Sequence, residues 1–259
     1  MNVIKIMGGL GNQLFQYAFG RVQISNGLYV KFDCRTYDKN NKQKWPRDFQ
    51  LNKFEGTHVR NSPFILSQPT IDDHKVGFNL DLLKLDNHNF HGYWQYLAYY
   101  EGILDTLRKE FRVKQELYNN VFTHLFFEIT TKENSVSIHV RRGDYLVQTW
   151  GILPFTYYLQ AVQHTKGDIY IFSDDIEWCK KHFKQDYFDR QITFVTTGED
   201  CLDFELMRHC KHNIIGSSTF SWWAAMLNEN SNKIVCAPSQ WLGGWTDASL
   251  IYPHEWIKL

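Results

Sequence analysis

The chain has 259 residues, 43% of them hydrophobic and 16% aromatic, which is enough apolar material for a core and excludes a disordered protein. Lys plus Arg and Asp plus Glu number 28 each, and this balance excludes the broad basic surface of a nucleic-acid-binding protein. At this length one large α/β unit or two compact halves would fit, and we expect two halves.

The first half begins with a pattern of strand, glycine turn and helix. Residues 3–7 predict a strand, and apolar residues at helical spacing (Leu14, Ala18 and Val22) predict a helix that ends near Asn26. Residues 29–32 predict a second strand, which completes a βαβ unit. Residues 38–85 have no sustained period and predict long loops with short helices. Helical patterns follow over residues 93–111 and 121–127.

The second half alternates more regularly. Strands are predicted at residues 136–140, 169–172, 192–195, 213–215 and 233–236, and helices at residues 154–163, after Asp175, and at residues 201–210 and 219–227. Such alternation predicts a parallel sheet covered on both faces, where ligands bind at the carboxyl ends of the strands. We place the domain boundary near residues 132–134, giving domains at 1–133 and 134–259.

The cysteines and the N-terminus indicate a cytoplasmic protein. Five scattered cysteines form no Cys-x-x-Cys pair and no Cys/His cluster of zinc spacing, so we expect reduced, buried thiols and no metal ion. The first residues do not resemble a signal peptide, and no run of ~18 apolar residues could span a bilayer. Any association with a membrane is expected to be peripheral.

A glycine-rich turn joins the first predicted strand to its helix. Its sequence is Gly8-Gly9-Leu10-Gly11-Asn12-Gln13. Glycines let the backbone approach a ligand closely, and a helix N-terminus presents unpaired N–H groups. Leu14 stands where the dinucleotide-binding fingerprint requires its third glycine, so this is not that fingerprint. A plain structural turn is the alternative.

Two adjacent arginines follow the strand predicted at residues 136–140. They belong to the segment His139-Val140-Arg141-Arg142-Gly143-Asp144-Tyr145. A guanidinium group matches a phosphate in bidentate geometry, so an anion is the expected partner. The alternative is that Asp144 neutralises one arginine within the loop.

A third polar segment, Gly216-Ser217-Ser218-Thr219-Phe220-Ser221-Trp222-Trp223, follows another strand and opens a helix. Hydroxyls and N–H groups at a helix N-terminus suit a phosphate, although ordinary N-capping would need only one of these hydroxyls. The two tryptophans are expected in the core. Asp174 after a strand and Asp203 in a first helical turn could each reach a ligand or serve the helix that follows.

In this order, the three motifs resemble those of the α-1,2-fucosyltransferases of glycosyltransferase family 11. The resemblance implies a GT-B-like α/β fold, in which two Rossmann-like halves face a cleft and the C-terminal half holds GDP-fucose. It implies inverting transfer of L-fucose from GDP-β-L-fucose to the 2-hydroxyl of a β-galactoside in a glycan acceptor. The α-1,6- and protein O-fucosyltransferases share the arginine loop, so the resemblance implies fucosyl transfer more directly than the linkage.

The resemblance also implies roles for individual residues. Arg141 would contact the diphosphate with support from Arg142, His139 and Asp203 would hold the guanosine, and Asn12 would reach the reacting centre from across the cleft. The predicted catalytic residues are therefore Arg141, Asn12 and Asp144. The predicted GDP-fucose contacts are Gly9, Gly11, Gln13, His139, Arg142, Asp174, Asp203, Ser217, Ser218, Thr219 and Phe220.

The sequence indicates how the leaving diphosphate is stabilised, and it leaves open the general base, the alternative functions and the acceptor. The sequence has no Asp-x-Asp motif, and arginines with a helix N-terminus can stabilise a leaving diphosphate, so we expect neither a metal nor another cofactor. The general base is open among Asp144, Asp174, Glu205 and no dedicated base. The alternatives are another GDP-sugar transferase, such as an α-1,6-fucosyltransferase, and a non-catalytic GDP- or glycan-binding protein. We expect residues 37–100 to choose the acceptor, which could be lactose, N-acetyllactosamine, a type 1 chain or a lipid-linked O-antigen repeat.

Overall fold

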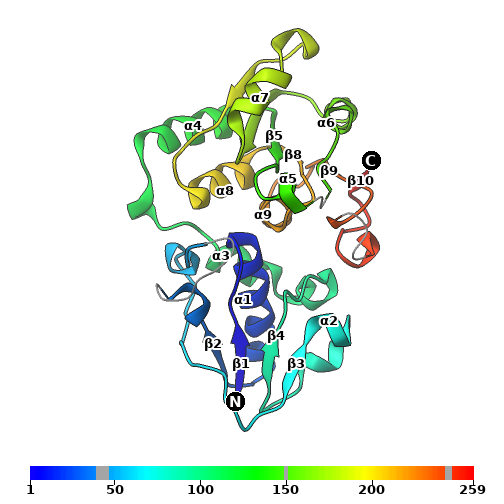
Figure 1. Cartoon of the computed structure of the whole chain (residues 1–259). Coiled ribbons are helices and arrows are strands. Elements are labelled where there is room, and N and C mark those ends of the chain that lie inside the picture. Colours follow the sequence, from blue (N-terminus) through cyan, green and yellow to red (C-terminus); the bar gives the residue numbers. More distant parts are fainter. Residues whose placement is uncertain (39–46, 149–150, 243–246) are drawn as a thin grey trace. The chain divides into compact units, whose positions relative to one another are not determined.

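The computed structural model describes residues 1–38, 47–148, 151–242 and 247–259. It divides into two compact units, unit 1 (Met1–Lys114) and unit 2 (Gln115–Leu259). Each unit is built on its own parallel sheet with helices packed against it (Figure 1), so the predicted α/β class with parallel sheets is confirmed. Residues 39–46 of the expected loop region lie outside the described part.

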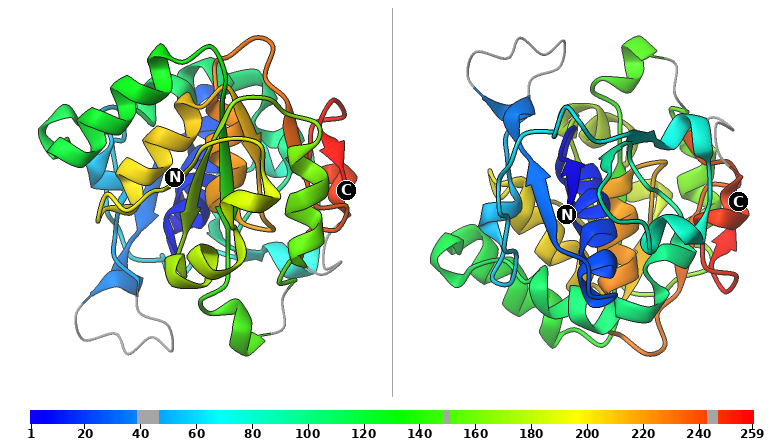
Figure 2. Two further views of the ribbon diagram at one scale, coloured as in Figure 1. Left: turned by 90° about the horizontal axis from the view of Figure 1, so that it is seen from above. Right: turned by 90° about the horizontal axis from the view of Figure 1, so that it is seen from below.

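Unit 1 contains a four-stranded parallel sheet with the order β2-β1-β4-β3. Its strands are β1 (Asn2–Lys5), β2 (Val30–Asp33), β3 (Thr70–Asp72) and β4 (Asn89–His91). Helix α1 (Leu10–Ser25) joins β1 to β2 as predicted and lies along both strands (Figures 1 and 2). Gly20 permits this close packing, because a Cβ there would lie 2.7 Å from the Phe32 ring and 2.9 Å from Ile4.

The rest of unit 1 departs from the predicted elements. Strands β3 and β4 arise near or within the expected loop region, where three residues are too few to show a period. The long helix expected over residues 93–111 is wrong: after β4 come 3-10 turns at Leu97–Tyr99 and Glu101–Ile103, and only then α3 (Leu104–Glu110). The helix does not start at Tyr93 because Trp94 has a φ of +58°, which is incompatible with a helix. The short helix α2 (Asp73–Val76) follows β3.

Unit 2 contains a six-stranded parallel sheet with the order β10-β9-β8-β5-β6-β7. The strands are β5 (Ser135–Val140), β6 (Asp168–Ser173), β7 (Ile192–Phe194), β8 (His212–Ile214), β9 (Val235–Ala237) and β10 (Ile257–Lys258). The helices are α4 (Asn120–Thr131), α5 (Tyr145–Gln148), α6 (Phe155–Val162), α7 (Ile176–His182), α8 (Asp200–His209) and α9 (Thr219–Leu227). The predicted alternation is confirmed, and β10 is an addition.

The two faces of the unit 2 sheet are covered by different helices. Val136 and Ile138 of β5 lie in an apolar cluster with buried residues of α6 and α7. On the other face, Asn213 of β8 donates to Ser137 Oγ and to the Met207 carbonyl of α8, and the His139 ring lies against Phe220 of α9. The polar strand residues thus face α8 and α9.

The units divide between Lys114 and Gln115, earlier than the boundary that we predicted near residues 132–134. The difference comes from α4, which packs against α8 of unit 2. Lys132 Nζ also donates to Glu128 on α4 (2.8 Å) and to Asp168 on β6 (2.6 Å). The predicted boundary therefore falls beside an ion-pair network that ties α4 to β6. In the described ranges no helix is long and apolar enough to cross a membrane.

Candidate active site

The carboxyl ends of three neighbouring strands, β8, β5 and β6, meet at one edge of the unit 2 sheet. Ile138 of β5 lies opposite Ile214 of β8, and Val140 lies opposite Ser173 of β6. The segments that follow these strands therefore lie side by side. They carry the arginine pair, the Gly-Ser-Ser-Thr motif and Asp174, so the fold brings these predicted groups of unit 2 together.

Arg141 lies at the centre of this edge. Its Nη2 is 2.5 Å from Asp144 Oδ1, its Nη1 is 2.8 Å from Asp174 Oδ2, and the Tyr145 ring centre is 5.5 Å from its Cζ. The alternative in which Asp144 neutralises an arginine thus describes this structure. A guanidinium carries five N–H donors and the side chain is 22% exposed, so an anion can share it or displace a carboxylate.

Arg142 has a different environment from its neighbour. Its Nε is 3.1 Å from Asp175 Oδ2, and its guanidinium lies 4.0 Å from the centre of the Trp178 ring on α7. Its backbone N–H donates to Asp174 Oδ1 at 2.9 Å. These contacts hold the loop after β5 against the loop after β6, and the predicted role of Arg142 toward the diphosphate stays a prediction.

The loop after β5 fits closely around Asp174. A Cβ on Gly143 would lie 2.5 Å from Asp174 Oδ2, the oxygen that pairs with Arg141. Any larger residue at this position would displace the carboxylate. Asp174 therefore orients Arg141 in this structure.

His139 is buried near the end of β5, and its imidazole is neutral. Its Nδ1 has no hydrogen-bond partner in the part of the chain that the structure describes. Burial, and next the charge of Arg141, lower the pKa of His139 to about 3. The Phe220 ring lies 5.4 Å from the imidazole, measured between ring centres. The Nδ1 atom is itself buried, so in this structure a ligand does not reach it.

Asp203 presents one engaged and one unengaged carboxylate oxygen. Oδ1 accepts from Thr197 Oγ1 at 2.6 Å and from the Thr197 N–H at 3.4 Å. Among the described residues, none donates to Oδ2. Burial raises the pKa of Asp203 to about 6. This carboxylate can accept N–H groups of a ligand when it is ionised.

The first turn of α9 has no capping side chain. Ser218 is the N-cap residue, and its hydroxyl makes no capping hydrogen bond, so capping does not explain this serine. The Ser217 hydroxyl donates to the Gln240 carbonyl at 3.4 Å, and the Tyr145 hydroxyl donates to the Ser217 carbonyl at 2.8 Å. Trp222 and Trp223 are fully buried, so the prediction that they belong to the core is confirmed.

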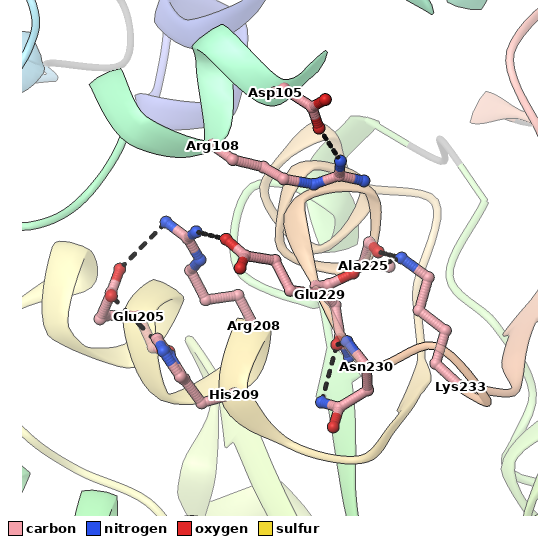
Figure 3. Close-up of polar contacts among 10 residues, drawn as sticks. Asp105, Arg108, Glu205, Arg208, His209, Ala225, Glu229, Asn230 and Lys233 are labelled. Atoms are coloured by element: carbon pink, nitrogen blue, oxygen red, sulfur yellow. Dashed lines mark hydrogen bonds and ion pairs between the residues drawn. The ribbon is translucent and has the colours of Figure 1, made fainter.

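The opposite end of α9 carries a cation (Figure 3). Lys233 Nζ donates to the carbonyls of Ala225 (2.8 Å) and Asn228 (2.7 Å), where the helix ends. Glu205 on α8 is buried, and its carboxylate lies 3.5 Å from Arg208 and 3.7 Å from His209. These partners make Glu205 the weakest of the three carboxylates considered as a general base.

In unit 1 the glycine turn lies between β1 and α1. Gly8 has a φ of +81°, which favours glycine. Gln13 is fully buried: its Nε2 donates to the carbonyls of Gly8 and Asp48, and its Oε1 accepts from the Gln50 N–H. Gln13 thus supports the turn, and its predicted contact with GDP-fucose is not tested. Gly9 is the N-cap of α1 and makes no side-chain cap, and Gly11 is buried in its first turn.

One contact of Asn12 was not predicted from the sequence. The Asn12 Oδ1 accepts from Gln95 Nε2 at 3.1 Å. Gln95 lies four residues beyond β4, where the sequence pattern indicated a helix. No signal in a single sequence identifies this pair, because the sheet order that brings the two segments together is a tertiary property.

In the described part of the chain, no three His, Cys, Asp or Glu side chains are arranged to hold a metal ion. The cysteines form no disulfide, with Cys34 half-buried and the other four buried. The predicted independence from metals stays a prediction.

Comparisons with known proteins identify a family. A sequence model of a protein family, described as "Glycosyl transferase family 11", matches residues 36–259. "O-antigen biosynthesis glycosyltransferase WbnK" from Escherichia coli is 28% identical, covering 98% of this chain and 99% of that protein. "Alpha-1,2-colitosyltransferase" from Escherichia coli is 29% identical, covering 99% and 98%. Human "Galactoside alpha-(1,2)-fucosyltransferase 1" is 34% identical over 36% of this chain and 28% of its own length.

A solved structure has a similar fold. The fucosyltransferase NodZ from Bradyrhizobium is 11% identical, with a TM-score of 0.55 over 87% of this chain and 92% of that chain. At this sequence identity the similarity is evidence for the fold alone, and it confirms the expected GT-B-like architecture.

Proposed function

Because the chain belongs to glycosyl transferase family 11, we propose that it transfers L-fucose from GDP-β-L-fucose to the 2-hydroxyl of a β-galactoside. The transfer inverts the anomeric configuration and needs no metal ion. The observation that carries the proposal is that Arg141 and the uncapped start of α9 follow the neighbouring strands β5 and β8. A guanidinium and a helix N-terminus together suit a diphosphate.

The donor would lie along the carboxyl edge of the unit 2 sheet. Arg141 and the hydroxyls of Ser217, Ser218 and Thr219 would take the diphosphate. His139 and Asp203 would hold the guanosine, and Asp203 offers a carboxylate oxygen to which no described residue donates. These roles are those that the family resemblance implies, and the chemistry of each side chain supports them.

The diphosphate would compete with two carboxylates for Arg141. Asp174 is fixed by the backbone of Arg142, whereas Asp144 lies on the same loop as Arg141, three residues away. We expect Asp144 to give up its contact when the donor binds. Among the three carboxylates considered, Asp144 is then the one to test as the general base.

The chemistry follows from this arrangement. The acceptor oxygen attacks the anomeric carbon from the face opposite to GDP, through a transition state with oxocarbenium character. Negative charge develops on the departing GDP, and Arg141 with the start of α9 stabilises it without reorganisation. Asn12 of unit 1 is proposed to contact the reacting groups.

A second candidate donor has a specific observation in its favour. The relative named as a colitosyltransferase matches this chain over nearly its whole length, whereas the human fucosyltransferase matches 36% of it. Colitose is fucose without its 3-hydroxyl, so the same diphosphate and guanosine contacts would serve either donor. A donor panel therefore has to include both GDP-sugars.

The test is transfer by the purified protein in the presence of EDTA. GDP-fucose, GDP-colitose and GDP-mannose are each combined with lactose, N-acetyllactosamine, a type 1 chain and a lipid-linked O-antigen repeat. The last is included because one relative is named for O-antigen biosynthesis. We expect an α-1,2-linked fucoside, with the linkage determined by NMR. An α-1,6 product, or binding of GDP without transfer, would select one of the alternative functions.

The variant Arg141→Ala tests the site itself. Removing one preorganised donor to developing charge costs ~10²–10³ in rate, so we expect at least this loss in kcat with an unchanged circular dichroism spectrum. Arg112→Ala, which removes an exposed arginine of unit 1, is the matched control and should keep full activity. Full activity in Arg141→Ala would remove the basis of the proposal.

A further inference from the structure

The turn after β4 in unit 1 contains a strained residue. Trp94 has a φ of +58° and is fully buried. A bulky residue rarely adopts this left-handed conformation, and such strain persists only where the surroundings enforce it. Strained residues of this kind concentrate at functional sites, so we asked which side chains this turn holds in place.

Three side chains from different elements enforce the conformation. Asp73 Oδ2, at the start of α2, accepts from the N–H groups of Tyr93 (3.1 Å) and Trp94 (2.9 Å). Gln16 Nε2 of α1 donates to the Gly92 carbonyl at 3.0 Å, and the Tyr100 hydroxyl donates to the Trp94 carbonyl. The Trp94 indole also stacks on the Phe19 ring with 4.4 Å between ring centres. The turn is therefore fixed at both ends and through its side chain.

The turn after β4 places Gln95 beside the glycine-rich turn between β1 and α1. Strands β4 and β1 are neighbours in the sheet, so the segments at their carboxyl ends lie side by side. Gln95 Nε2 donates to Asn12 Oδ1 at 3.1 Å. The Asn12 Nδ2 lies over Gly8, where an added Cβ would come within 2.7 Å of it. The oxygen and the nitrogen of this amide thus have different, defined surroundings.

We propose that Gln95 is a positioning residue that fixes the amide of Asn12 for fucosyl transfer. Because the Gln95 side chain donates an N–H to the Asn12 amide, the Asn12 oxygen faces Gln95. The N–H groups of the Asn12 amide then point in a fixed direction. The strained turn holds Gln95 in the place from which it can do this. This inference rests on the proposed function, in which Asn12 contacts the reacting groups.

A double-mutant cycle in the full chain tests the inference. The variants are Gln95→Ala, Asn12→Ala and the double variant, with Gln163→Ala on the surface of unit 2 as the control. We expect Gln95→Ala to lower kcat about 10-fold, within the range of coupling between residues in contact, while KM for the donor and the melting temperature stay unchanged. In the Asn12→Ala background the same change should cost nothing further. Gln95→Glu, which cannot donate, should behave as Gln95→Ala.

A readout independent of activity is the side-chain amide of Asn12 in NMR spectra, assigned by its loss in Asn12→Ala. We expect Gln95→Ala to shift this signal and to raise its solvent exchange. Equal losses of kcat from Gln95→Ala in both backgrounds, or an unchanged Asn12 signal, would overturn the inference. Full activity in Asn12→Ala would also overturn it, while leaving fucosyl transfer intact. If the wild-type chain transferred no sugar, the proposed function would fail, and the amide signal would still decide whether Gln95 positions Asn12.

Discussion

Arg141 and Arg142 are adjacent in the sequence, yet their environments differ. The sequence predicts two arginines at the end of a strand, and the structure confirms this placement. The difference comes from Asp175 and Trp178, which lie after the next strand and on its helix and contact Arg142 alone of the pair. Such partners are set by tertiary packing, and a single sequence does not reveal them.

If Asp203 holds the guanosine as proposed, donor binding depends on pH. Its pKa is raised to about 6, so the carboxylate that would accept guanine N–H groups is mostly protonated at pH 5 and ionised at pH 8. We expect GDP-fucose to bind about 10-fold more weakly at pH 5, by the ratio of ionised carboxylate. Titration calorimetry at the two pH values measures this. Asp203→Asn should bind weakly and without this dependence, while the exposed control Asp186→Asn should follow the wild type.

The same carboxyl group should reduce stability at high pH. A pKa above the ordinary value of about 3.9 means that the folded chain holds this proton more tightly than the unfolded chain. The contribution of Asp203 to the free energy of unfolding is therefore lost as pH rises from about 4 through 6, by roughly 3 kcal/mol. Urea unfolding at pH 8 should find Asp203→Asn more stable than the wild type. Lower stability of this variant at pH 8 would contradict the assigned cause of the shift.

At the scale of elements, periodicity predicts most of unit 2 and little of unit 1. In unit 2 the strands and helices alternate with regular spacing, and the loops that carry the site follow directly from this order. In unit 1 no helix begins at residue 93 because Trp94 has a φ of +58°, in a turn whose N–H groups the Asp73 carboxylate holds. That carboxylate lies 20 residues earlier, beyond the reach of a local pattern.

A substitution that caps the start of α9 should raise the stability of the chain and weaken its proposed binding of an anion. Because the Ser218 hydroxyl makes no cap, Ser218→Asp should supply one and raise the free energy of unfolding by ~1 kcal/mol. The same carboxylate would repel the diphosphate, so we expect GDP-fucose to bind at least 10-fold more weakly. Ser218→Ala is the control and should leave stability unchanged. Urea unfolding and calorimetry measure the two effects, and undiminished binding by Ser218→Asp would place the diphosphate elsewhere.

At the scale of the whole molecule, the sequence predicts two α/β parts with a boundary near residues 132–134, and the structure divides into two compact units between Lys114 and Gln115. The predicted boundary lies near residues 132–134, where Lys132 pairs with both Glu128 and Asp168. A lysine in a linker and a lysine in an ion-pair network look the same in a sequence. The partners become visible only when α4 is seen against the sheet.

Truncation distinguishes the two boundaries. Residues 115–259 keep α4 and should unfold cooperatively, whereas residues 134–259 lose the buried side chains Phe122, Leu125 and Ile129. Each of these contributes about 1.5–3 kcal/mol, so their loss removes much of the ~5–15 kcal/mol that stabilises a typical domain. Thermal melts followed by circular dichroism compare the fragments. Equal melting temperatures would favour the boundary predicted from the sequence.

Helix α9 has an ammonium group at one end and uncapped N–H groups at the other. The ammonium group lies at the end of the helix where the peptide dipoles place partial negative charge. Trp222 and Trp223 of this helix are buried, so solvent does not screen its middle. Chemical modification of Lys233, such as carbamylation during storage in urea, would remove the cation from the carbonyls of Ala225 and Asn228 and so destabilise the last turn of the helix, where a terminal charge acts. Protein handled in aged urea would therefore unfold at a lower denaturant concentration than fresh protein, although no residue of the proposed site had been modified.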